Sequence, residues 1–100
     1  MAIEVTARHL KISPELQGYA RDKAEALVAD FPKAEFIHVV LDMEGHLYRA
    51  EYVVQHKGLP CVGTAEDGAD MITAIDLAVE KVTKQLRKHR DKVVDAHHHG

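Results

Sequence analysis

The sequence predicts an α+β fold with the element order β-α-β-β-β-α, in which two helices pack on one face of a four-stranded sheet. Three observations lead to this fold class. Four short stretches are alternately or continuously apolar, as strands are. Two longer stretches repeat apolar residues at steps of three and four, which is typical of amphipathic helices. Short turns join the last three strands, which favours an antiparallel meander.

The length and composition suit one domain with its own core. The chain has 100 residues, 46% of them hydrophobic, so it can bury a core of ordinary size. Residues 1–95 are predicted to form this domain, and the polar residues 96–100 a flexible tail.

The first strand and the first helix have clear local signals. Residues 3–8 alternate apolar and polar side chains, as a half-buried strand does. Ser13 is the expected N-cap of the following helix, with Pro14 at its first position and Glu15 in its first turn. Pro32 is expected to end this helix. Its apolar face is expected to comprise Leu16, Ala20, Ala24, Leu27 and Phe31.

Three further strands are expected at residues 36–43, 48–56 and 59–66. The first of these is the most continuously apolar, which indicates a central position in the sheet. In the next, Tyr48, Ala50, Tyr52 and Val54 are expected to face one side. Pro60 lies near the start of the last, where a missing N–H is tolerated.

A long helix is predicted over residues 70–92, with Asp67 as a candidate cap and a start uncertain by one or two residues. Its two sides differ. The apolar line is expected to comprise Ile72, Ile75, Val79, Val82, Leu86 and His89. At roughly 100° per residue, a row of lysines falls nearly opposite this line, with Arg87 and Arg90 on its flank. The lysine row consists of Lys81, Lys84, Lys88 and Lys92.

Charge is segregated along the chain. Residues 1–80 carry 7 Lys and Arg against 14 Asp and Glu, whereas residues 81–100 carry 6 against 2. A basic pole on an acidic body suits a polyanion, because lysines that meet phosphates release counterions. The alternative is a solvated helix face, whose lysines lie near the C-terminus where the helix dipole favours cations.

Other classes of protein find little support in the sequence. No apolar run approaches the roughly 20 residues that span a bilayer, and the N-terminus lacks the layout of a signal peptide. The single cysteine, Cys61, fits a reducing cytoplasm and is expected to be a small buried residue. No nucleophile elbow, P-loop or dinucleotide fingerprint is present, so we expect neither an enzyme nor a cofactor. The tail histidines, His97–His99, are not expected to form a defined metal site.

The long helix carries a motif of known type. Asp70-Met71, Ala74-Ile75-Asp76, Lys81, Gln85-Leu86, Lys88-His89 and Lys92 resemble the signature of the ribosome hibernation-promoting factor family, also known as ribosome-associated inhibitor or sigma-54 modulation proteins. The opening VTARHLKISPEL resembles the first strand, turn and capped helix of that family, and the match covers essentially residues 3–93.

This resemblance implies both a fold and a function. The implied fold is similar to that of a double-stranded RNA-binding domain. The implied function is to bind the small ribosomal subunit and its rRNA between head and body, at the sites of messenger RNA and transfer RNA, and so to silence idle ribosomes. The chain looks like the short form, whose members promote inactive ribosome dimers. A second, ribosome-pairing factor is left open, and the free protein is expected to be monomeric.

Given this resemblance, the lysine row is the leading set of candidate RNA contacts. Its lysines are expected to contact phosphates rather than bases. The other candidates are Arg87, Arg90, Arg8, Lys11 and Arg21. Three alternatives stay open: Arg21 could pair with Glu25, the stem of Arg90 could pack on the core, and His89 could be a packed histidine. Two other functions also remain: a generic RNA-binding module, or a small protein that binds a metal or ligand through its histidines.

Overall fold

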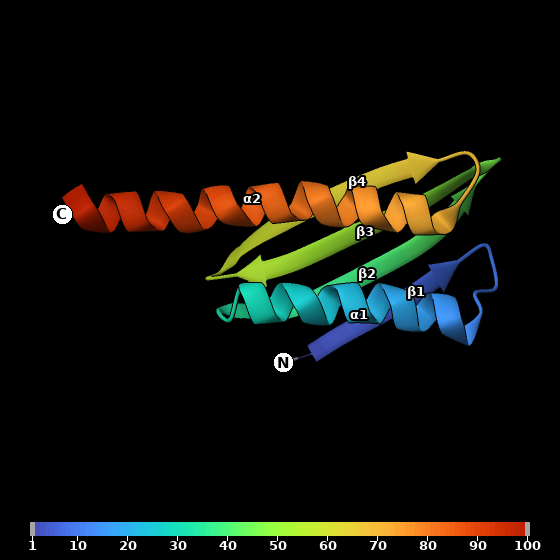
Figure 1. Ribbon diagram of the computed structural model, residues 1–100, viewed down its shortest axis with the longest axis horizontal. Helices are drawn as coiled ribbons and strands as arrows, with labels where there is room; N and C mark the ends of the chain where they lie inside the picture. The colour runs from blue at the N-terminus through green and yellow to red at the C-terminus, as the bar shows by residue number, and fades with distance from the viewer. Residues whose placement is uncertain (1, 100) are drawn as a thin grey trace.

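The computed structural model describes the backbone of residues 2–99 and the side chains of residues 2–90. It confirms the predicted order of elements (Figure 1). The elements are β1 (Ala2–Arg8), α1 (Pro14–Asp30), β2 (Ala34–Glu44), β3 (Leu47–His56), β4 (Leu59–Asp67) and α2 (Met71–His99). Within this part of the chain, neither helix is long and apolar enough to cross a membrane.

The four strands form one sheet in the order β1-β2-β3-β4. The last three pair antiparallel as predicted, and β1 pairs parallel to β2 because α1 carries the chain back across the sheet. Figure 1 shows both helices on the same face, α1 over β1 and β2, and α2 over β3 and β4. The core lies between the helices and the sheet, and β2 is central as predicted.

The first helix begins and ends close to where the sequence predicts. The Ser13 hydroxyl accepts the Leu16 N–H at 3.1 Å, which satisfies one of the free donors of the first turn. Ala20, Ala24 and Leu27 are buried, which confirms the predicted apolar face. The helix is tied to β3 because the buried Tyr52 hydroxyl donates to the Ala20 carbonyl at 2.8 Å.

The start of α2 corrects the proposed cap. The Asp70 carboxylate accepts the Ile72 N–H at 3.0 Å, so Asp70 caps the helix. The Asp67 carboxylate instead accepts the N–H groups of Ala69 and Asp70, at 2.9 and 2.8 Å, and so holds the turn that leads into the helix.

The buried stripe of α2 also differs from the predicted apolar line. Ile72 is 41% exposed, so its assignment to the packed line is wrong, whereas Val79 is partly buried and packs against the core. The residues that pack are Met71, Ala74, Ile75, Ala78, Val82 and Leu86. The helix is thus rotated by roughly 40° from the orientation that the apolar residues alone suggest. The reason is steric, since Ala74 and Ala78 let the helix approach the sheet more closely than larger side chains would.

The helix assignment runs on to His99, past the predicted end at Lys92. The side chains of Lys92 and His97–His99 lie outside the described residues. The flexible tail at residues 96–100 therefore stays a prediction.

Candidate nucleic-acid interface

Three members of the lysine row, Lys81, Lys84 and Lys88, are exposed along one side of α2. The row does not lie opposite the buried stripe. Because of the rotation of α2, it lies on the flank of the helix above β4, as two hydrogen bonds show. Lys81 Nζ donates to the Thr64 carbonyl at 3.0 Å, and Gln85 Oε1, on the same flank, accepts the Val62 N–H at 2.9 Å.

These two bonds protect an edge strand. β4 is the last strand of the sheet, so its outward N–H and C=O groups have no neighbouring strand. Lys81 and Gln85 satisfy one carbonyl and one N–H of that edge. The Lys81 ammonium has three donors, so two remain for a ligand. Lys81 therefore has a structural role that the sequence reasoning missed.

The neighbouring cations differ in how freely they can reach a ligand. Lys84 Nζ lies 3.6 Å from Glu80, one turn away, but both side chains are well exposed and such pairs are weak. Arg87 and Lys88 are exposed. The Arg90 guanidinium lies 4.9 Å from the centre of the Phe31 ring, so it packs on the body as a cation–π contact.

The cations near the N-terminus do not extend the lysine row. Arg8 and Lys11 are exposed at the end of β1 and just after it, and β1 is the opposite edge of the sheet from β4. Any contact of Arg8 and Lys11 with RNA would therefore lie at the other edge of the sheet from the lysine row, and their role as RNA contacts stays a prediction. Arg21 donates to the Ile3 carbonyl at 3.2 Å, which joins α1 to β1. Among the described residues, no ion pair between Arg21 and Glu25 forms, although both line a shallow hollow on that side.

Asp76 joins the two helices, a role that the sequence did not reveal. Its carboxylate accepts the Tyr19 hydroxyl at 2.6 Å and lies 3.7 Å from Lys23 Nζ. The Tyr19 pKa is raised, first by this hydrogen bond. Asp76 therefore helps to hold α1 against α2.

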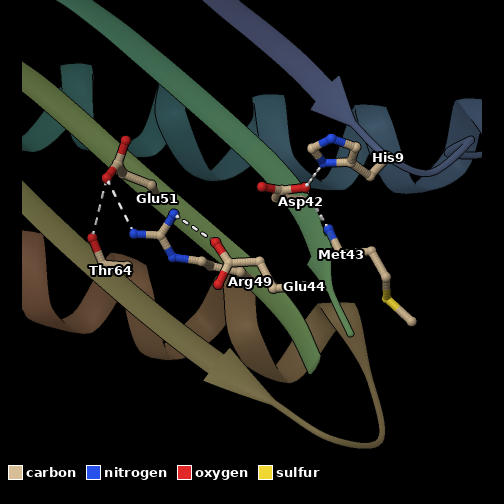
Figure 2. Close-up of polar contacts among 7 residues, drawn as sticks. All are labelled: His9, Asp42, Met43, Glu44, Arg49, Glu51 and Thr64. Atoms are coloured by element: carbon tan, nitrogen blue, oxygen red, sulfur yellow. Dashed lines mark hydrogen bonds and ion pairs between the residues drawn. The ribbon is translucent and has the colours of Figure 1, made fainter. Parts of the chain in front are cut away.

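One part of the uncovered face of the sheet carries polar side chains that pair with one another. Figure 2 shows this face with both helices behind it. Arg49 lies between Glu44 and Glu51, at 3.4 and 3.9 Å, and Thr64 donates to Glu51 at 3.4 Å. A face whose arginine is already held by two carboxylates is a poor surface for RNA, which favours the helix side as the interface.

His9 and Asp42 form a second polar contact at the end of β2 (Figure 2). Their Nδ1 and Oδ1 atoms are 2.8 Å apart, and His9 adopts a left-handed φ of 61°. The pKa of Asp42 is lowered, first by this contact and also by the Met43 N–H that it accepts. His9 is therefore anchored to the sheet between Arg8, the last residue of β1, and Lys11.

Two histidines meet where α2 passes the end of β3. His56 Nδ1 and His89 Nδ1 are 3.0 Å apart, and Phe31 packs edge-on against His56. This confirms His89 as a packed histidine. Burial lowers the pKa of His56, and the nearby His89, Lys57 and Arg90 lower it further against an opposing effect of Glu35.

Acid is therefore expected to destabilise the fold through His56. Its folded pKa lies below the unfolded value of 6.5, so the unfolded chain binds more protons as the pH falls through that value. The contribution of neutral His56 is complete above about pH 6.5 and is lost as the pH drops toward the lowered pKa. Urea unfolding at two pH values, one on either side of this window, measures the loss. H56Q should show a smaller loss than the wild type, whereas H46Q, a change in the exposed β2–β3 turn, should behave as the wild type does. Equal pH dependence in H56Q and the wild type would contradict this account.

No metal centre is evident in the described part of the chain, where no group of three or more potential ligands gathers. Cys61 is buried as predicted, and burial raises the pKa of its thiol, so it stays protonated near neutral pH.

Comparison with known proteins finds similar sequences and structures over nearly the whole chain. Residues 3–94 match the family described as "Sigma 54 modulation protein / S30EA ribosomal protein". Two similar proteins are each named "Ribosome hibernation promoting factor". The one from Pseudomonas putida is 28% identical over 92 residues, which cover 92% of this chain and 89% of that protein. The one from Escherichia coli K12 is 29% identical over 93 residues, which cover 93% and 97%.

Solved structures share the fold. A ribosomal subunit interface protein from Coxiella burnetii superposes with a TM-score of 0.82 at 24% identity, over 91% of this chain and 99% of that one. The N-terminal domain of Protein Y from Thermus thermophilus superposes with a TM-score of 0.76 at 30% identity, over 89% and 99%. The resemblance read from the sequence is thus confirmed over nearly the whole chain, which belongs to the Sigma 54 modulation protein / S30EA ribosomal protein family.

Proposed function

We propose that this protein is a ribosome hibernation factor, which binds RNA of the small ribosomal subunit in the channel of messenger RNA and transfer RNA and so silences translation. Its relatives of similar length bear the name ribosome hibernation promoting factor. The observation that carries the proposal is the exposed row Lys81, Lys84 and Lys88 on one helix of a well-packed body. Such a row suits the regular phosphates of an RNA backbone, which position a protein without reading bases.

The proposal extends to what the bound protein does. Occupation of the channel needs no chemical step, so we propose a binding function without a cofactor. We further propose that the free protein is a cytoplasmic monomer and that the bound protein promotes inactive ribosome dimers, with or without a second pairing factor.

Sedimentation of ribosomes with the purified protein tests binding and pairing together. The protein is expected to sediment with isolated small subunits and not with isolated large subunits. In a ribosome preparation it should also increase the dimer peak. A protein that stays at the top of the gradient with small subunits present would contradict the proposal.

A second candidate is a generic RNA-binding module that acts away from the ribosome. It is favoured by the same lysine row, because phosphate contacts carry no sequence information. Competition separates the two. Bulk double-stranded RNA at comparable mass should displace a generic binder from small subunits, whereas a ribosome-specific protein should stay bound.

A further inference from the structure

A shallow hollow opens between the start of β4 and α2, beside the lysine row. Its volume is about 350 Å³, and its lining consists of Leu59, Pro60, Cys61, Gln85, Lys88 and His89. Leu59 is 54% exposed, more than any other large hydrophobic residue of the described chain. A single exposed leucine is ordinary. Here, however, it lies at one side of a shallow, mostly apolar depression.

The walls of the hollow are held in place by contacts to the body. The His89 ring is fixed by His56, with the ring centres 5.0 Å apart and the planes at 79°. Gln85 is held by the Val62 N–H, which leaves the two N–H donors of its amide for a ligand. The buried, protonated Cys61 thiol adds no charge to the lining. A ligand that enters therefore finds the Gln85 and His89 side of the hollow already in place, which limits the entropy lost on binding.

The charge around the hollow selects the kind of ligand. Its six lining residues include one cation, Lys88, and no carboxylate. Arg87 is adjacent in sequence, and Lys84 lies one turn earlier on the same side of α2. An apolar depression with ammonium groups at its rim complements a ligand in which a flat apolar part is attached to an anionic group.

We infer that this hollow accepts one unpaired RNA base, packed against Leu59 and Pro60, while Lys88 and Lys84 contact the phosphates on either side of that nucleotide. RNA-binding proteins commonly insert splayed bases between side chains and hold the backbone with cations. The inference rests on the proposed function and adds to it: the interface contains a non-electrostatic base contact as well as the phosphate contacts of the lysine row.

Salt dependence separates the two kinds of contact. L59A removes apolar surface and no charge, so it should weaken binding to small subunits about five- to tenfold with an unchanged log–log salt slope. K88Q should weaken binding and also reduce that slope by about 0.7–0.9. The matched control is L47A, which trims another exposed leucine, 42% exposed, in the β2–β3 hairpin. It should bind as the wild type does.

A photo-crosslinking residue at position 59 identifies the occupant. With small subunits it should crosslink to ribosomal RNA at one or a few neighbouring nucleotides. The inference is overturned if L59A binds as tightly as L47A, or if the crosslink goes to a ribosomal protein. Those results would leave the proposed function standing, provided that the wild type binds and K88Q weakens it. Absence of wild-type binding would instead refute the proposed function itself.

Discussion

Reversing the charge at two positions of the lysine row, in K84E/K88E, is expected to lower affinity for the small subunit by at least a hundredfold at roughly 0.1 M salt. Each phosphate contact contributes about 0.9 to the log–log salt slope, which corresponds to nearly tenfold in affinity at that salt concentration. Two lost contacts give roughly a hundredfold, and the new carboxylates add repulsion. A salt titration of small-subunit binding measures both the affinity and the slope. The slope should fall by about twice 0.9, the contribution of two phosphate contacts.

Stability and net charge need separate controls. Both lysines are exposed, and the only cost expected in the fold is the new like-charge pair with Glu80, of a few tenths of a kcal/mol. K33E, in an exposed turn, is the charge-matched control for the single variant K84E. It should lose far less affinity than K84E does. If the two single variants weakened binding equally, only net charge would matter and the lysine row would not be the interface.

The substitution G63A is expected to destabilise the fold by about 3 kcal/mol, at the upper end of overpacking changes. Gly63 is buried where α2 crosses β4. A Cβ there would collide with the Ala78 carbonyl oxygen, and would lie 2.5 Å from the Val82 nitrogen and 2.9 Å from the Val82 Cβ. Two of these three atoms belong to the helix backbone and cannot rotate away. Urea unfolding should show the loss, and Tm should fall by roughly 12–24 °C.

The same substitution in α1 is the matched control. Gly18 lies inside that helix, and a Cβ there would meet nothing within 4 Å. G18A should therefore stabilise the protein by about 0.5–1 kcal/mol, because alanine loses less backbone entropy than glycine in a helix. Wild-type stability in G63A would mean that α2 does not pack so closely on β4. It would remove the support for the rotation that places the lysine row above that strand.

These two predictions concern one feature, the orientation of α2 about its axis. The close contact at Gly63 turns Ala78 and Val82 toward the sheet. That rotation brings the lysine row from the far side of the helix to the flank above β4, where Lys81 and Gln85 bond the strand edge. A variant that loosens the contact should therefore weaken RNA binding as well as the fold.

Local signals were enough for the elements and their order. The cap at Ser13, the alternation in β3 and the apolar repeat of α1 each depend on residues that are close in sequence, and all are found in the structure. The cap of α2 is the exception, because the sequence predicts Asp67 and the structure has Asp70, a second suitable acid three residues later. Only the geometry of the turn separates their roles.

The sequence by itself determined the α+β order of elements, the family and the presence of a cationic helix, because periodicity, caps and motifs are properties of neighbouring residues. Only the tertiary structure decided which side of α2 is buried, that Arg8 and Lys11 lie at the opposite sheet edge, and that Leu59 and His89 line one hollow. These outcomes depend on contacts between residues far apart in the chain. Gly63 on β4 lets the backbone of α2 approach the sheet and so sets the orientation of that helix. Nothing in the sequence of the helix indicates this glycine.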